Sequence, residues 1–335
     1  MKSEYVQYLG ISKNENFNEG IGVSELLRDE KRIQEVLDEA VIVARRCQEG
    51  KVADYIPELA QVNPDFTGVA VRLMDGRYFF AGDSDHERFS LQSVAKLVLL
   101  IGLLEEFGEE DVFSWVKVEP SGDDFSSVAR LDQFGPLPSN PMLNAGAIAL
   151  SNHIPGHSEE ERFAWLNHWV KRLFGSQLMV NMQVFASERR TGDRNRALAY
   201  LLRSNHIITG SVEETLEYYF YLCSFEASLQ QSSYLPYLLA SSGCNPAGEQ
   251  VISKKTAQHV NAIMATCGLY NESGTHLVRT GMPAKSGVAG YIVAVVPDSA
   301  GIAVVSPRIN RKGTSVRGEI ILAHIASELD WHLYR

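Results

Sequence analysis

The stretch of sequence that decides the fold is the run FSLQSVAKLVLLIGLLEEFG, at residues 89–108. Its apolar second half predicts a buried helix that ends near Gly108. Near its start, Ser93 and Lys96 form an S-x-x-K pair, and residues three apart share one face of a helix. A neutral lysine can take the serine proton and so make the hydroxyl a nucleophile. This requires the lysine pKa to fall by about 3 units, through burial or a second nearby cation.

A second charged motif, Lys285-Ser286-Gly287, stands far downstream, directly before an expected strand that begins at Gly290. S-x-x-K followed by K-[ST]-G on a strand is the signature of penicillin-recognising enzymes and β-lactamases. The strand would offer backbone N–H groups to the oxyanion of a tetrahedral intermediate. The two motifs, in this order, therefore predict a serine nucleophile.

The middle motif of those enzymes, S-D-N or Y-x-N, is not obvious in this chain. Tyrosines are the alternative, because a phenol can relay a proton where those enzymes use another hydroxyl. Tyr218, Tyr219 and Tyr221 share one expected helix, and Tyr270 precedes a turn. Packing in the core is the competing interpretation for the helix tyrosines.

Strand patterns lie towards both ends of the chain. Residues 67–74 and 78–81 flank the turn signal Asp75-Gly76, and residues 290–296 and 302–306 form a second apolar pair. Because these segments flank a helical block, the simplest fold is α+β, with one antiparallel sheet built from both chain ends. Helices at 32–46 and 318–329 would flank that sheet.

The middle of the chain is mostly helical by period. We expect an N-terminal extension at 1–32, a sheet domain at 33–105 and 278–335, and an inserted helical domain at 106–277. Pro136, Pro138 and Pro141 indicate an extended loop at 123–144. The expected helices cover residues 158–174, 194–203, 211–223, 228–240 and 255–266, of which the fourth contains Pro236, a residue that would kink or split it.

Two polar stretches have a composition suited to binding a zwitterion. Residues 140–147 place Asn144 beside small residues, which allow a close approach to the backbone. Residues 187–195 are dense in charges and amides, and include Glu188 and Asn195. A carboxylate would bind an ammonium group, while amides and phenols would bind a carboxylate and a carboxamide. A solvated loop that caps a helix is the alternative for the second stretch.

Together these motifs resemble those of the serine-dependent glutaminases, which have the β-lactamase-like fold. The resemblance covers residues 32–335, and Asn271 stands where that family often has an acidic residue. It implies hydrolysis of L-glutamine to L-glutamate and ammonia, without a cofactor. The stretches that carry it are KVADYIPELA (51–60), QSVAK (92–96), PSNPMLNAGAI (138–148), SERRTGDRN (187–195), EYYFYLCS (217–224), CGLYNESG (267–274) and MPAKSGVAG (282–290).

The resemblance also implies roles for single residues. Ser93 would be the nucleophile, Lys96 its base, and the backbone N–H groups of Ser93 and Val288 the oxyanion hole. Either Tyr219 or Tyr270 would return the proton to the leaving ammonia. Family members also tend to be dimers or tetramers, which implies a homo-oligomer. The implied substrate-binding residues are Tyr55, Ser93, Asn144, Glu188, Asn195, Tyr219, Tyr270 and Val288.

Composition excludes several other classes of protein. The chain has 335 residues, 45% of them apolar, which is too apolar for a disordered tail. With 31 Lys and Arg against 41 Asp and Glu, its net charge of −10 argues against nucleic acid or anionic lipid as the partner. The first twenty residues contain no apolar run of signal-peptide length, and the longest apolar runs are far short of a membrane helix, so we expect a cytoplasmic protein without membrane contact.

Metal and nucleotide sites are also not expected. The four cysteines form no C-x-x-C, so reduced thiols are the simplest interpretation. The nine histidines form no H-E-x-x-H, and no G-x-G-x-x-G or Walker A motif is present. Two other functions stay open: a different serine hydrolase of this fold, such as a peptidase, esterase or lactamase, and a non-catalytic module that binds an amino acid.

Overall fold

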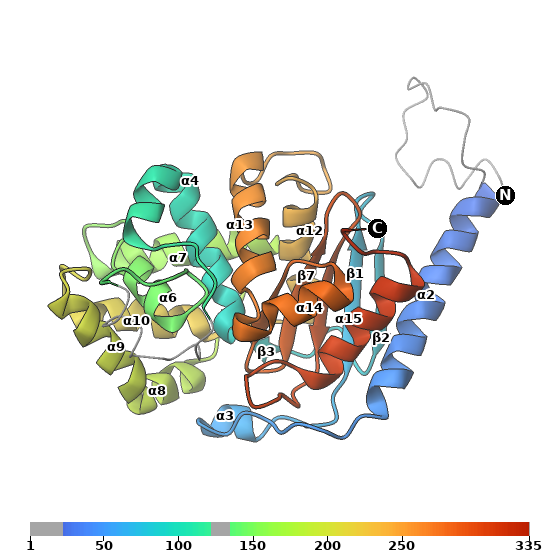
Figure 1. Cartoon of the computed structure of the whole chain (residues 1–335), viewed down its shortest axis with the longest axis horizontal. Helices are drawn as coiled ribbons and strands as arrows, with labels where there is room; N and C mark the ends of the chain where they lie inside the picture. Colours follow the sequence, from blue (N-terminus) through green and yellow to red (C-terminus); the bar gives the residue numbers. More distant parts are fainter. Residues whose placement is uncertain (1–22, 122–134, 335) are drawn as a thin grey trace.

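The computed structural model describes residues 23–121 and 135–334, and its centre is a five-stranded antiparallel sheet. The strand order is β2-β1-β8-β7-β6, so the two strands from the first part of the chain lie beside the three from the last part (Figure 1). Val69 of β1 pairs with Ala81 of β2 on one side and Val304 of β8 on the other. The expected sheet and its antiparallel pairing are confirmed. The strands are β1 (Gly68–Leu73), β2 (Tyr78–Gly82), β6 (Ala284–Gly287), β7 (Tyr291–Val296) and β8 (Ala300–Val305).

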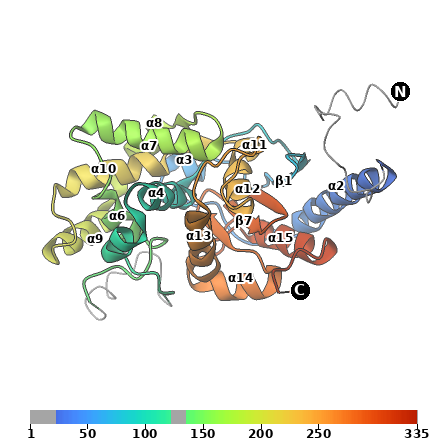
Figure 2. The same cartoon turned by 90° about the horizontal axis from the view of Figure 1, so that it is seen from above.

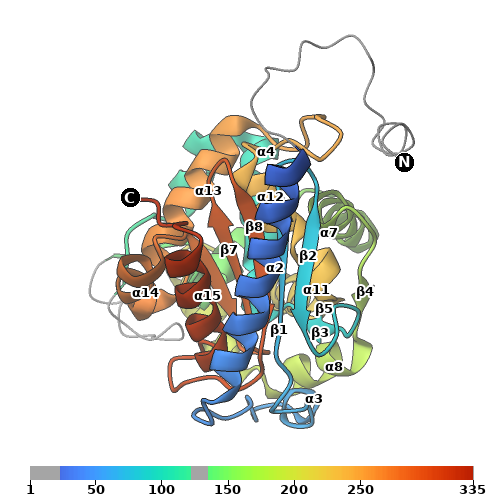
Figure 3. The same cartoon turned by 90° about the vertical axis from the view of Figure 1, so that its right-hand side faces the viewer.

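Two helices cover one face of this sheet. They are α2 (Val23–Arg45) and α15 (Val316–Glu328), which lie side by side (Figures 1 and 3). Val36, Leu37 and Ala40 recur at helical spacing on α2, and all three are fully buried against the sheet. The expected helix at 32–46 is present, but it begins at Val23 and therefore continues through residue 32. Residues 1–22 of the expected extension lie outside the described residues.

Helices from the middle of the chain cover the opposite face. α12 (Tyr234–Ala240) packs on β7 and β8, and α4 (Lys96–Trp115) lies beside α13 (Lys254–Cys267). The expected helix at 228–240 is split at Ser233 into α11 (Leu229–Ser232) and α12. Pro236 occupies the first turn of α12, where its missing N–H costs no helical hydrogen bond. Within α4, Gly108 has a φ of +80°, which is not helical. The regular helix that begins at Lys96 therefore ends near Gly108, as the sequence predicts.

Five helices, α6 to α10, gather on the side away from α2 and α15 (Figure 2). A second sheet of three short strands, in the order β3-β5-β4, joins this part of the molecule to the start of α4; the sequence did not predict it. Its strands are too short to give a recognisable alternation. The elements are β3 (Phe89–Ser90), β4 (Met179–Val180), β5 (Phe225–Ala227), α6 (Asn144–Ser151), α7 (Glu159–Phe174), α8 (Met182–Thr191), α9 (Asp193–Ser204) and α10 (Val212–Cys223).

The connecting segments agree in part with expectation. The expected loop at 123–144 falls largely on residues 122–134, outside the described part, and Asn144 begins α6. The short elements α3 (Pro57–Ala60), η2 (Tyr270–Glu272) and α14 (Ser273–Thr280) complete the fold. Within residues 23–121 and 135–334, no helix is long and apolar enough to cross a membrane.

Candidate active site

Ser93 lies in a strained turn at the edge of the main sheet. The turn is a 3₁₀ helix, η1 (Gln92–Ala95), which runs directly into α4 at Lys96. Since a 3₁₀ helix has three residues per turn, Ser93 and Lys96 lie on the same side of it, as the S-x-x-K spacing predicts. Gln92 has a φ of +48°, and such strained backbone in non-glycine residues clusters at functional sites. The Leu91 N–H donates to the Phe225 carbonyl at 2.7 Å, which fixes the turn against β5.

Lys96 is buried, with 1% of its surface exposed. Its Nζ donates to the Met142 carbonyl at 3.0 Å and to Asn144 Oδ1 at 2.7 Å. Burial lowers the pKa of Lys96 to about 7, because an ammonium group loses its hydration there and faces no carboxylate that would offset the loss. A substantial fraction of Lys96 is therefore neutral near pH 7. A neutral amine has two N–H donors and one lone pair, so its two acceptors leave the lone pair available for a hydroxyl proton.

Lys285 is a second buried amine beside the first. Its Nζ donates to the carbonyls of Gly268 at 3.0 Å and Ser286 at 2.7 Å, and lies 3.4 Å from Tyr270 Oη. Burial, and then the neighbouring Lys96, hold the pKa of Lys285 well below its usual range. The Tyr270 ring lies close to both amines, at 4.4 Å from Lys285 Nζ and 5.8 Å from Lys96 Nζ. One phenol therefore contacts the pair of lysines that the two motifs supply.

Strand β6 approaches the serine turn through a glycine. A Cβ atom added to Gly287 would lie 2.7 Å from the Leu91 carbonyl oxygen, closer than such contacts occur, so a glycine is needed there. This close approach brings Val288, the next residue, to the same cavity as Ser93. The strand that contains the K-S-G motif thus ends beside the start of η1.

A cavity of about 870 Å³ opens at this point. Residues expected to bind substrate come to its wall from six separate segments of the chain. Lys96 and Tyr270 do not line the cavity; they lie behind its wall, where Lys96 reaches Asn144. The expected residues that line it are Tyr55, Ser93, Asn144, Glu188, Asn195, Tyr219 and Val288.

The acidic wall of the cavity is formed by Glu188. This carboxylate is 6% exposed, and its Oε1 accepts a hydrogen bond from the Tyr55 hydroxyl at 2.8 Å. Burial raises the pKa of Glu188, while the hydrogen bond from Tyr55 opposes that shift. Burial, and then the Glu188 charge, raise the pKa of Tyr55, so its hydroxyl keeps the proton that it donates. The Tyr55 hydroxyl lies inside the cavity, although 47% of the surface of the whole residue is exposed.

Amides form the opposite wall. Asn144 Nδ2 donates to Asn195 Oδ1 at 3.0 Å, while Asn144 Oδ1 accepts from Lys96. These contacts direct the oxygen of the Asn144 amide to Lys96 and its nitrogen to Asn195. Tyr219 lines the same cavity from α10, and burial raises its pKa well above the usual value. A chain of polar groups therefore runs from Lys96 to the cavity surface.

Several cavity residues were missed from the sequence, among them Gln92 and Cys223. Gln92 directly precedes Ser93, and its Oε1 lies 3.0 Å from the Tyr55 hydroxyl oxygen. Its place in the S-x-x-K stretch was the available signal, but its inward direction depends on the strained φ, which no residue pattern indicates. Cys223 also lines the cavity, and burial raises its pKa to about 12, which keeps the thiol neutral. Among the described residues, no group of three or more His, Cys, Asp or Glu side chains could hold a metal ion.

Comparison with protein families and curated sequences places this architecture among known enzymes. The family model described as Glutaminase matches residues 50–334. The "Glutaminase" of Legionella pneumophila (strain Philadelphia 1) is 57% identical over 299 residues, which cover 89% of this chain and 96% of that protein. The "Glutaminase" of Alkaliphilus oremlandii is 41% identical, over 85% of this chain and 94% of that protein.

Solved structures agree with the sequence comparisons. The structure titled "Probable glutaminase ybaS" superposes with a TM-score of 0.88 at 35% identity, and the match covers 91% of this chain and 99% of that one. The probable glutaminase of Bacillus subtilis has a TM-score of 0.82 at 34% identity, over 92% of this chain and 98% of that one. Both likenesses extend over nearly the whole fold, including the two sheets and the helices that form the cavity.

Proposed function

Because this chain belongs to the glutaminase family, we propose that it hydrolyses the side-chain amide of L-glutamine through an acyl-enzyme on Ser93. The Ser93 hydroxyl attacks the amide carbon and ammonia leaves. Water then attacks the resulting ester and releases L-glutamate. The observation that carries the proposal is the buried Lys96 amine, three residues from Ser93 on the same side of the turn, with its pKa lowered to about 7.

Lys96 is the proposed general base. Its two N–H donors are occupied by Met142 and Asn144, so the lone pair of the neutral amine is available to the Ser93 proton. The proton then has to reach the departing nitrogen, since an amide ion is a poor leaving group. Tyr270 is the better placed of the two candidate relays, because its hydroxyl lies next to Lys285 and its ring next to Lys96. Tyr219, which lines the cavity, is the alternative proton relay.

The oxyanion is proposed to bind at the backbone N–H groups of Ser93 and Val288. Ser93 lies in the first turn of η1, where N–H groups point away from any partner within the helix. Val288 follows β6, which the Gly287 contact holds against the same turn. Two preorganised donors of this kind stabilise the charge that develops on the amide oxygen in the transition state.

Glutamine itself is proposed to bind with its α-ammonium group at Glu188. Burial makes this carboxylate a strong partner for an ammonium group, because water does not compete there. The Tyr55 hydroxyl orients it, and Gln92 supplies a further amide at the same place. The α-carboxylate and the side-chain amide are proposed to bind at Asn144, Asn195 and Tyr219 of the opposite wall, and at Tyr270, which lies behind the wall.

The state of the protein in the cell is part of the same proposal. We expect a cytoplasmic homo-oligomer, a dimer or tetramer, with no nucleic acid or membrane partner. All four cysteines are free thiols, as is usual for proteins of reducing compartments. Light scattering coupled to gel filtration measures the oligomeric state, and a monomer at working concentration would contradict it.

The deciding experiment is ammonia release from L-glutamine, with L-asparagine and D-glutamine as comparisons. Wild-type protein should act on L-glutamine, and Ser93→Ala should lose at least about 10³-fold in kcat, since a missing nucleophile costs at least as much as a missing oxyanion donor. Ser93→Ala should still bind L-glutamine by calorimetry. Near-normal turnover by Ser93→Ala would rule out the covalent mechanism, and binding without turnover by the wild type would favour the non-catalytic alternative.

A further inference from the structure

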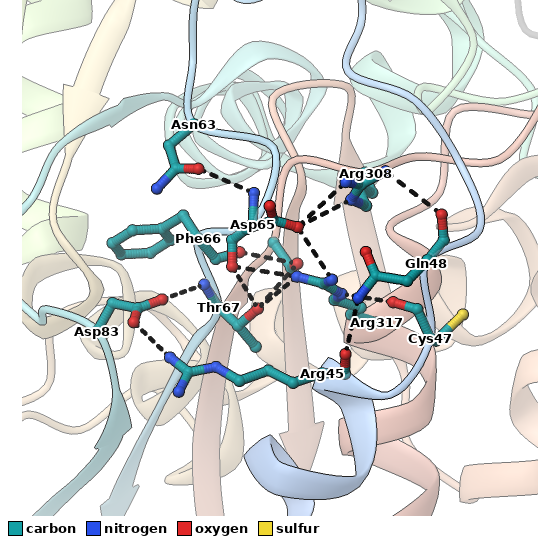
Figure 4. A network of polar contacts seen from close by, with 11 residues as sticks. Arg45, Cys47, Gln48, Asn63, Asp65, Phe66, Thr67, Asp83, Arg308 and Arg317 are labelled. Carbon is teal, nitrogen blue, oxygen red and sulfur yellow. Dashed lines mark hydrogen bonds and ion pairs between the residues drawn. The ribbon is translucent and has the colours of Figure 1, made fainter.

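A buried arginine outside the cavity joins two distant parts of the chain. Arg317, the second residue of α15, is 1% exposed. Its Nε donates to the Cys47 carbonyl at 2.9 Å, just after the end of α2. Its Nη1 donates to the Asp65 carbonyl at 3.1 Å and to Thr67 Oγ1 at 3.2 Å, just before β1 (Figure 4). One guanidinium therefore ties the end of α2 to the approach to β1.

A second arginine binds the same two places. Arg308 donates through Nε and Nη2 to Asp65 Oδ1, at 3.3 and 3.1 Å, and through Nη1 to the Gln48 carbonyl at 3.3 Å. Arg317 Nη2 also reaches Asp65 Oδ1, at 3.2 Å. Hydrogen bonds first from Arg308 and then from Arg317 lower the pKa of Asp65, so the carboxylate is ionised between two guanidinium groups (Figure 4). We call Arg308, Arg317 and Asp65 the arginine clamp.

The arginine clamp holds together the two ends of the segment 48–66, which connects α2 to β1. This segment contributes residues 49–55 to the cavity, including Tyr55. The segment also packs beside α8, where the Ser187 hydroxyl donates to Glu58 at 3.0 Å. A long loop whose ends are held together in this way can be compact without strands of its own.

The arginine clamp also connects the segment 48–66 to the loop before α15, which lines the cavity as well. The loop that contains Arg308 continues through Ile309, and Lys51 and Ile309 exchange both backbone hydrogen bonds, at 3.0 and 2.8 Å. Ile309 and Val316 both line the cavity. The loop before α15 and the segment 48–66 are therefore one connected wall, with the buried guanidinium at its base.

We propose that Arg317, held by Arg308 and Asp65, is a positioning residue that fixes Tyr55 against Glu188. The proposal rests on the proposed function, in which Glu188 binds the α-ammonium group of glutamine. Burying the Arg317 guanidinium costs desolvation free energy, and its partner Asp65, which is 60% exposed, offsets little of that cost. An apolar side chain in the same place would avoid the cost. An apolar side chain would not hold oxygen atoms at both ends of the segment. With the ends fixed, Tyr55 is ordered before substrate arrives, and binding loses less conformational entropy.

The first test is the kinetics of Arg317→Gln, which keeps a polar side chain but loses the fork of donors. We expect KM for L-glutamine to rise about tenfold or more and kcat to stay within about threefold, because misplaced binding groups weaken ground state and transition state alike. Arg317→Lys should lie between this variant and the wild type, since one ammonium cannot span both ends. The matched control is Arg32→Gln, whose arginine joins α2 to α15 through Glu328 on the surface at 2.6 Å. It should keep the wild-type KM.

Two further measurements separate positioning from a structural role. In a double-mutant cycle, Arg317→Gln should raise KM much less in the Tyr55→Phe background than in the wild type, since both changes remove one interaction. Hydrogen exchange of the unliganded protein should be faster at 48–66 in Arg317→Gln and unchanged in β7 and β8. This second measurement needs no substrate, so it tests the clamp even if the protein fails to hydrolyse glutamine, a result that would overturn only the proposed function.

The outcomes that overturn the inference are specific. A folded Arg317→Gln with wild-type KM and wild-type exchange at 48–66 would show that the clamp positions nothing. Additive effects of Arg317→Gln and Tyr55→Phe on KM would separate the clamp from Tyr55. If Arg317→Gln does not fold, Asp65→Asn replaces it, because that side chain is largely exposed. Asp65→Asn should then raise KM and speed exchange at 48–66, and wild-type values for both would overturn the proposal.

Discussion

At the scale of single residues, the site depends on a lysine that is neutral when ordinary lysines are charged. Burial lowers the pKa of Lys96 to about 7 from an ordinary value of 10.5. A protonated lysine cannot accept the Ser93 proton, so activity is present above this pKa and lost below it. We therefore predict that kcat/KM falls about tenfold for each pH unit below about 7.

The pH profile of kcat/KM, measured with circular dichroism at each pH, checks this prediction. The spectra exclude acid unfolding as the cause of the fall. Lys96→Arg serves as the matched variant: its guanidinium stays protonated, so it should be inactive at every pH. A profile that is flat down to pH 5 would contradict the assignment of Lys96 as the base.

A second prediction at this scale concerns Glu188. Glu188→Gln keeps the shape of the side chain and its bond to Tyr55 but removes the charge, so the ammonium group of glutamine loses a charge-assisted hydrogen bond. We expect KM to rise about 10- to 100-fold, with a smaller change in kcat, since such bonds contribute about 1.5–3 kcal/mol. Steady-state kinetics on L-glutamine measures it. An unchanged KM would place the ammonium group elsewhere.

Sequence reasoning worked best at this scale where a motif has a fixed spacing. The residues of the two lysine motifs come together, although nearly 190 positions separate Lys96 from Lys285. Gln92 was missed because its role depends on a positive φ, which is stabilised by β5 and not by its neighbours in sequence. Arg317 was missed for a related reason. Two of its four hydrogen bonds go to backbone carbonyls and a third goes to the Thr67 hydroxyl, and no pattern of side chains in the sequence indicates such contacts.

At the scale of elements, the contact between β6 and η1 sets the geometry of the proposed oxyanion hole. Gly287→Ala would place a methyl group 2.7 Å from the Leu91 carbonyl, and that backbone atom cannot turn aside. We predict that β6 shifts away from η1 and that kcat falls about 10²-fold, the cost of losing one oxyanion donor. Ammonia release and thermal unfolding, measured together, test it.

The matched control for this change is Gly274→Ala. Gly274 lies in α14, and an added Cβ atom would meet nothing within 4 Å. It should keep wild-type kcat and gain slightly in stability, because alanine is the better helix former. Wild-type kcat in Gly287→Ala would remove the role proposed for this contact.

Elements with a strong hydrophobic period were the ones the sequence predicted. α7, α9, α10 and α13 begin and end within about one residue of expectation, because all four have an apolar face and three of them have a serine cap. The three-stranded sheet was missed because two of its strands have only two residues each. α8 was not among the expected helices, since its charged stretch at 187–191 hides the few buried positions that hold it.

At the scale of the whole molecule, the two faces of the main sheet have separate apolar cores, one under α2 and α15 and the other around η1 and α4. Leu37 of α2 is fully buried in the first of these cores and does not line the cavity. We predict that Leu37→Ala lowers the free energy of unfolding by about 2–5 kcal/mol and leaves kcat/KM per folded molecule unchanged. Urea unfolding and active-site-normalised kinetics measure the two quantities.

The control for that substitution comes from the same helix. Ile42 is 57% exposed, so Ile42→Ala should change stability by no more than about 0.5 kcal/mol. If Ile42→Ala is as destabilising as Leu37→Ala, the outer surface of α2 is covered in solution, which is the result that the proposed oligomer would give. If Leu37→Ala lowers kcat/KM of the folded fraction, the two faces are coupled.

The division of the chain into domains stays a proposal at this scale. α6, α8, α9 and α10 share an apolar cluster of their own, which favours an inserted helical unit. α11 and α12 fall inside the same sequence range, 106–277, but contact the sheet. Sequence spacing predicted an insertion between the strands of the two chain ends, yet it gave no means of telling which inserted helices return to the sheet.

The strand order of the main sheet has a consequence for how the protein forms during translation. β1 is made early but pairs on one side with β8, and the Ser306 hydroxyl bonds to a carbonyl 240 positions earlier in the chain. β1 therefore lacks this partner until residues 300–305 have left the ribosome, and contacts so distant in sequence form slowly. A nascent chain that ends before β6 cannot assemble the serine turn with its partner strand, so the site forms only after that strand has been made.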